Sequence, residues 1–114
     1  MNTEVFVSGL REAVVEENIA IYRQIFSETA LSSATDPYWQ RALHLYANLT
    51  VEEREVLFEI MKQVAMDTVS NVLGVIDGVS VLGGMSQPLE LRSGADVLSG
   101  DLQSQFLVLD EQAR

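Results

Sequence analysis

Residues 50–77, TVEEREVLFEIMKQVAMDTVSNVLGVID, decide the fold of this chain. Thr50 and Glu53 have the spacing of a capping box, in which the threonine oxygen accepts from the backbone three residues on and the glutamate reaches back. Asp77 precedes Gly78, a pair that marks a turn. Between these two signals the apolar residues recur at helical spacing, so the stretch predicts one long helix.

On a helical wheel this helix has one apolar arc and one polar arc. The apolar arc covers about half of the circumference, which is wide for a surface helix. We therefore expect it to be the central element and to contact two or more others. The apolar arc contains Leu57, Phe58, Met61, Val64, Ala65, Val69, Val72, Val75 and Ile76. The polar arc contains Glu59, Gln63, Asp67, Ser70, Asn71, Gly74 and Asp77.

Residues 3–29 also have a helical pattern, but its two apolar stripes are rotated against each other around residues 16–18. A kink there, two helices in succession, or one long helix with two different neighbours would each explain the rotation. The first stripe contains Phe6, Leu10, Ala13 and Val14, and the second contains Ile21, Tyr22, Ile25 and Phe26.

The remaining elements are predicted from turn and capping residues. Asp36-Pro37 predicts the start of a short helix that ends near Asn48, because proline suits the first helical position. Residues 79–82 and 89–92 predict two short strands of a hairpin around a connection from Gly83-Gly84 to Pro88, and residues 93–96 predict a separate turn. Residues 99–101 predict the cap of a last helix, in which Leu102, Phe106 and Leu109 share one face. The sequence thus predicts a single domain, residues 1–114, of the α+β class and predominantly α, with three main helices, a short β-hairpin and a C-terminal helix.

Composition excludes several classes of function. Seventeen acidic residues against seven basic ones give a formal charge of −10, which repels phosphate backbones and argues against nucleic-acid binding. The chain has no cysteine, so disulfides, thiolate metal sites and cysteine nucleophiles are excluded. No apolar run approaches the roughly 20 residues that span a bilayer, and residues 1–9 lack the pattern of a secretion signal. We expect a cytoplasmic protein that has no membrane contact.

Tests for reaction chemistry identify no catalytic, cofactor-binding or metal-binding residues. A carboxylate-bridged dimetal bundle needs Glu-x-x-His pairs, but the only histidine, His44, follows Arg41 at that spacing. A Mg²⁺ site is compatible with two acidic pairs at i, i+4 spacing, Glu12 with Glu16 and Glu55 with Glu59. Such pairs are more typical of a solvated helix face. His44 lies opposite the apolar side of its helix, which favours a surface position.

The polar arc of the long helix is the most suggestive cluster. Short polar residues are costly inside a helix because they compete for backbone hydrogen bonds. They either lie against another element or partner, or they bond locally and help to end the helix. Trp39 belongs either to an interface, which favours aromatic residues, or to the core. The possible interaction surface consists of Asp67, Ser70, Asn71, Asp77 and Trp39.

The segments DTVSN at residues 67–71, IDG at 76–78 and SGDLQSQFL at 99–107 resemble a pattern in small bacterial proteins of unassigned function. This resemblance covers the C-terminal half and implies no activity. The leading hypothesis is a non-enzymatic, acidic protein-interaction module. A homodimer is expected because an isolated two-stranded hairpin is marginal in water and the apolar arc is wide. The alternatives are an acidic inhibitor or immunity-type protein that neutralises a basic toxin or nuclease, and a small Mg-dependent hydrolase on a helical bundle.

Overall fold

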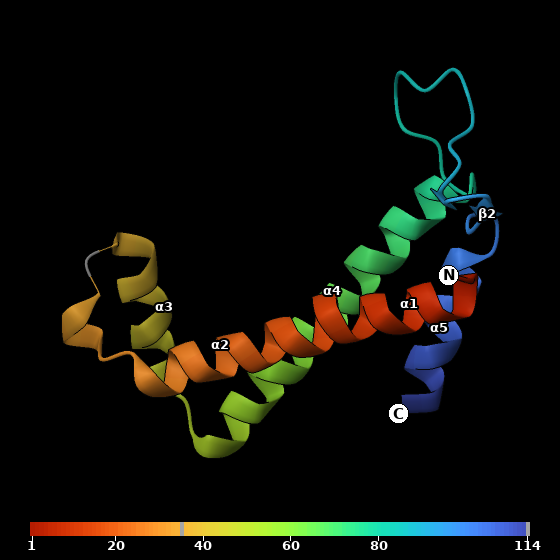
Figure 1. Ribbon diagram of the computed structural model, residues 1–114. Helices are drawn as coiled ribbons and strands as arrows, with labels where there is room; N and C mark the ends of the chain where they lie inside the picture. The colour runs from red at the N-terminus through yellow and green to blue at the C-terminus, as the bar shows by residue number, and fades with distance from the viewer. Residues whose placement is uncertain (35, 114) are drawn as a thin grey trace.

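The computed structural model describes residues 1–34 and 36–113 (Figure 1). The fold is α+β and predominantly α, as the sequence predicts, and the described residues include one small antiparallel hairpin. In chain order the elements are α1 (Thr3–Leu10), the π-helical η1 (Arg11–Glu16), α2 (Glu17–Glu28), the 3₁₀ turn η2 (Leu31–Ser33), α3 (Pro37–Ala47), α4 (Val51–Ile76), β1 (Arg92–Ser93), β2 (Asp96–Val97) and α5 (Leu102–Ala113).

The N-terminal helices α1, η1 and α2 form one continuous rod, which crosses α4 in Figure 1. A π-helical turn closes i→i+5 instead of i→i+4 hydrogen bonds and therefore rotates the faces on either side of it. This turn explains the rotated stripes, although it lies at Arg11–Glu16 and not around residues 16–18. The rod also has two different neighbours. Its fully buried residues near the N-terminus are Val7 and Val15, whereas Ala13, which we placed in the first stripe, is exposed.

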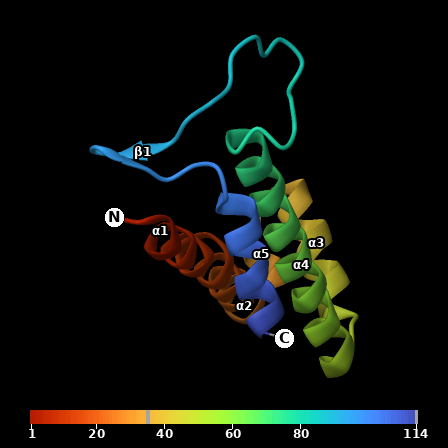
Figure 2. The same ribbon diagram turned by 90° about the vertical axis from the view of Figure 1, so that its right-hand side faces the viewer.

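The buried side chains form two separate clusters, one at each end of the rod. In Figure 2, α5 runs alongside α4, with α1 on its other side. The first cluster joins these helices and contains Val7, Val15, Met66, Leu73, Leu98, Leu102 and Phe106. The second joins α2, α3 and α4 and contains Phe26, Leu43 and Phe58, with Trp39 and Tyr46 packed against it.

Helix α4 begins and ends where its signals predict. Thr50 and Glu53 form both hydrogen bonds of the capping box, and the helix is capped by Asp77. The predicted apolar arc is wrong in part: Val64 and Val72 are 58% and 54% exposed, while Gly74 is buried. The buried positions follow an i, i+4 row, which is inclined to the helix axis and winds around it. A straight stripe on a wheel therefore misplaces residues far from the centre of the helix.

The hairpin is displaced from its predicted position. Arg92 pairs with Val97 and Ser93 with Asp96, around a two-residue turn in which Gly94 has φ +59°. Glycine at the first central position suits such a turn. Residues 79–82 form no strand, because the N–H groups of Val79 and Ser80 donate to the carbonyl of Gly74 and so complete the end of α4.

No helix within residues 1–34 and 36–113 is long and apolar enough to cross a lipid bilayer.

Candidate interaction surface

The side of α4 that faces away from the rest of the molecule carries a row of exposed apolar residues. We define the outer ridge as Val56, Ile60, Val64, Thr68 and Val72, spaced four residues apart. The four large apolar members are 50%, 56%, 58% and 54% exposed in chain order, and Thr68 is also exposed. No member carries a charge. Contiguous exposed apolar surface is one of the features by which interaction surfaces are recognised, so the outer ridge is the candidate surface of this chain.

The outer ridge lies opposite the row of α4 that packs on the other helices. That inner row includes Phe58, Met66 and Ser70, which are also spaced in multiples of four and are at most 5% exposed. Val56 of the outer ridge and Phe58 of the inner row are two residues apart, which is about 200° around a helix of 3.6 residues per turn. The two rows therefore wind along α4 on opposite sides over its whole length, so no described element of the chain covers the outer ridge.

Two of the predicted interaction residues border this surface. Asp67 and Asn71 are exposed and lie three and seven positions after Val64, which places them next to the outer ridge. Oδ1 of Asp67 accepts a hydrogen bond of 2.9 Å from Nε2 of Gln63. These two side chains are accessible to a partner.

Two other predicted interaction residues, Ser70 and Asp77, face α5 instead. Nε2 of Gln103 donates to the carbonyl of Ser70 at 3.0 Å and to its Oγ at 3.3 Å. The carboxylate of Asp77 accepts from the N–H groups of Gly100 at 2.7 Å and Gln103 at 2.8 Å. Gly74 lies under the same contact, because a Cβ there would meet Nε2 of Gln103 at 2.8 Å. This part of the polar arc thus holds α5 on α4.

Gln103 is the residue that the sequence did not single out. It lies one residue after Leu102 in the first turn of α5, where nothing in the pattern distinguishes it from a solvated glutamine. Only the small residues Ser70 and Gly74 across from it would have suggested a close approach.

The fifth predicted residue, Trp39, is half-buried in an aromatic cluster between α2 and α3. Its ring centroid lies 6.1 Å from that of Phe26, 6.1 Å from that of Tyr22 and 5.3 Å from that of Tyr38. Aromatic pairs at such distances stabilise a fold beyond the area that they bury. Trp39 therefore contributes to the second core cluster.

The carboxylates considered for Mg²⁺ are not gathered around one point. Oε1 of Glu16 lies 3.1 Å from Nη2 of Arg11 and 3.2 Å from Nζ of Lys62. Glu55 accepts two hydrogen bonds from Arg23, at 3.0 and 2.9 Å. These bonds, together with the guanidinium charge, lower the pKa of Glu55 and raise that of Arg23. Over residues 1–34 and 36–113, no group of three or more His, Asp or Glu side chains is placed to hold a metal ion.

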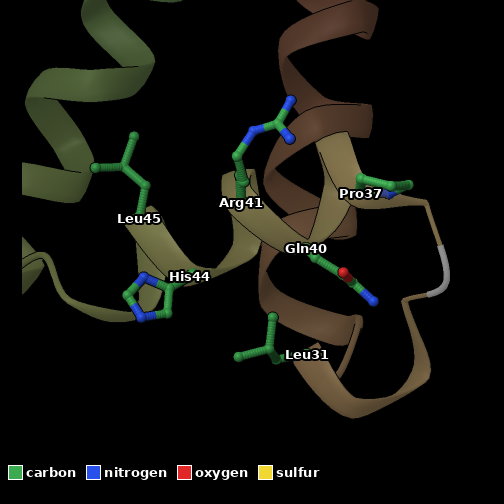
Figure 3. Close-up of a pocket in the computed structure, with 6 residues that line it drawn as sticks. All are labelled: Leu31, Pro37, Gln40, Arg41, His44 and Leu45. Atoms are coloured by element: carbon green, nitrogen blue, oxygen red, sulfur yellow. The ribbon is translucent and has the colours of Figure 1, made fainter.

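A hollow of about 620 Å³ lies along α3 (Figure 3). His44 lines it, as do Arg41 and Leu31, and His44 is exposed as predicted. Figure 3 shows the side chains of Arg41 and His44 pointing in different directions. A ligand pocket has a few polar groups that converge on the ligand. The hollow lacks that convergence.

Comparison with known proteins gives no match: no protein-family model, no curated protein and no solved structure is similar to this chain.

Proposed function

We propose that this chain is a non-enzymatic, acidic protein-interaction module of the cytoplasm and that it works as a homodimer. The observation that supports this proposal most strongly is the large surface of the single chain. Its accessible area is 7610 Å², about 1,400 Å² above the roughly 6,200 Å² typical of a monomer of 12.6 kDa. Its radius of gyration is 17.7 Å, against about 13 Å for a compact chain of this length.

The distribution of the core supports the same proposal. Among the residues that the structure describes, ten apolar ones are buried, in two clusters at opposite ends of a molecule measuring 51 × 34 × 23 Å. A shape of this kind leaves long helix faces uncovered. Burying them against another polypeptide would supply the apolar contacts that a compact monomer of this size makes internally.

Sedimentation equilibrium tests the homodimer. We expect a mass of 25.2 kDa, twice 12.6 kDa, at micromolar concentration. Because each subunit carries a charge of −10, raising the salt concentration should strengthen the association by screening repulsion. A mass of 12.6 kDa up to about 100 μM would overturn the proposal, since an interface of standard size reaches micromolar affinity or better.

A second candidate is an acidic inhibitor or immunity-type protein, which the charge of −10 favours. Positively charged partners would meet a field that speeds encounter. Added salt would then weaken the complex, the opposite of its effect on the homodimer. Titration with a basic nuclease or toxin at two salt concentrations distinguishes the inhibitor from the homodimeric module.

A further inference from the structure

We infer that a second copy of this chain packs on the outer ridge of α4, antiparallel to the first, about a two-fold axis that passes beside Val64. This inference rests on the proposed homodimer and specifies its interface. A two-fold interface is isologous, so the surface on each subunit must complement itself when it is rotated.

The outer ridge satisfies this condition about its middle residue. Ile60 and Thr68 each lie four residues from Val64, and Val56 and Val72 each lie eight residues from it. An antiparallel rotation therefore brings Val64 against the partner's Val64 and Ile60 against the partner's Thr68. At the rim of the interface, Val56 lies against the partner's Val72. Every such pairing joins side chains without charge.

Packing geometry agrees with a row of this spacing. Rows of residues at i±4 form the ridges that interlock in the commonest class of helix crossing, with axes 8–10 Å apart. The Cα atoms lie about 2.3 Å from each axis, which leaves roughly 3.4–5.4 Å between the two Cα atoms at the point of closest approach. The β-branched valine at the crossing point is small enough for that approach and limits the loss of side-chain entropy.

The charges on α4 select the antiparallel direction over the parallel one. The first half of the helix carries a cluster of carboxylates, one of which is paired with Arg23. The two basic residues of that half are held by other elements, Arg54 by the carbonyl of Tyr46 and Lys62 by Glu16, and so do not neutralise the cluster on the outward side. The second half carries Asp67 and Asp77, the latter already bonded to α5. Parallel pairing would bring the two clusters together. Antiparallel pairing separates them and also opposes the helix dipoles. The cluster consists of Glu52, Glu53, Glu55 and Glu59.

The surplus surface of the whole chain is large enough for a permanent dimer. If each subunit lost the surplus of about 1,400 Å², the interface would bury about 2,800 Å² in total, within the range of 2,000–5,000 Å² for permanent homodimers. The outer ridge is the centre of that interface, and the neighbouring exposed faces of α4 supply the rim.

Cysteine cross-linking tests the arrangement, because the chain contains no cysteine of its own. In Val64→Cys, the two thiols at the axis would be close enough for a disulfide, which needs Cα atoms about 4.4–6.8 Å apart. Oxidised glutathione accepts the two electrons and leaves as two molecules of reduced glutathione. Val81→Cys is the matched control, since Val81 is 76% exposed but lies in the loop after α4.

We expect Val64→Cys to form a covalent dimer at least tenfold faster than Val81→Cys at equal protein concentration. Ile60→Cys alone and Thr68→Cys alone should cross-link slowly, and a mixture of the two should cross-link fast. Fast cross-linking of Ile60→Cys alone would indicate parallel helices and overturn the inference.

Sedimentation separates failure of this inference from failure of the proposed function. Val64→Glu should raise the dimer dissociation constant at least 100-fold without loss of helical circular dichroism, whereas Val81→Glu should leave it unchanged. If the wild type is a dimer but neither Val64 variant differs from its Val81 control, the interface lies elsewhere and the homodimer stands. A monomeric wild type would overturn both proposals.

Discussion

Asp77 links the end of α4 to the start of α5, and its replacement by alanine is the most informative test of the fold. The carboxylate accepts from the N–H groups of Gly100 and Gln103, which are 23 and 26 residues away in the chain. It thereby caps α5, whose residues Leu102 and Phe106 are fully buried. Without this cap, α5 would keep its apolar contacts but lose the anchor of its first turn.

The expected magnitude follows from the two hydrogen bonds. A hydrogen bond to a charged group contributes about 1.5–3 kcal/mol, and the lower value suits this partly exposed site, giving about 3 kcal/mol for the pair. Removing the carboxylate also relieves its unfavourable position at the C-terminus of α4, by about 0.5 kcal/mol. We therefore expect Asp77→Ala to lower the free energy of unfolding by about 2.5 kcal/mol. Asp77→Asn, which keeps one acceptor oxygen, should cost about half as much.

Urea denaturation followed by circular dichroism at a fixed protein concentration measures this change. With a slope of about 1.5 kcal/mol per molar urea, the midpoint of Asp77→Ala should fall by about 1.7 M. Asp67→Ala is the control, because its side chain is exposed on the same helix and its removal should cost less than about 0.5 kcal/mol. Equal midpoints for the two variants would refute the assignment of Asp77 as the cap of α5.

Three further predictions concern other contacts of α4. Replacing Glu55 by Gln removes the ion pair with Arg23 that lowers the pKa of Glu55. The stability that the ion pair contributes is complete above the unfolded-state pKa of about 4.3 and disappears as the pH falls through the lowered folded-state pKa. The urea midpoint of the variant should therefore fall less between pH 6 and pH 3 than that of the wild type. An equal fall would contradict this. Gly74→Ala should cost about 0.5–1 kcal/mol of unfolding free energy, because displacing Gln103 outweighs the helix preference of alanine, whereas the same change in a Gln103→Ala background should stabilise by about 1 kcal/mol. A double-mutant cycle measures this reversal of sign, and its absence would show that Gln103 moves aside freely. Thr50→Ala should lower the unfolding free energy by about 1 kcal/mol through loss of the capping box, and an unchanged thermal midpoint would argue against it.

Local signals in the sequence predicted the helices better than they predicted the faces of those helices. The capping box at Thr50 and the Asp36-Pro37 start appear in the structure as expected, because each depends on atoms within a few residues. The π-helical turn at Arg11–Glu16 appeared in the sequence only as a rotation of two stripes. Its position depends on which neighbours the rod meets, and those neighbours come from distant parts of the chain.

The hairpin and the polar arc also show that local signals do not predict contacts between distant parts of the chain. Residues 79–82 have an apolar pattern that fits a strand, but the carbonyl of Gly74 takes the N–H groups of Val79 and Ser80 first. Within the polar arc, Ser70 and Asp77 contact α5, whereas Asp67 and Asn71 remain exposed. A wheel could not separate these residues, because it does not show where another helix crosses.

The sequence by itself determined the class of fold, the ends of α3 and α4, the strong negative charge and the lack of cysteine chemistry. These properties depend on composition and on hydrogen bonds between near neighbours, which a linear pattern contains. Only the tertiary structure decided that Ser70, Gly74 and Gln103 form the contact between α4 and α5, and that Val56, Ile60, Val64 and Val72 lie uncovered. The angle at which the helices cross sets which row of α4 is buried, and that angle results from packing side chains that are far apart in the chain.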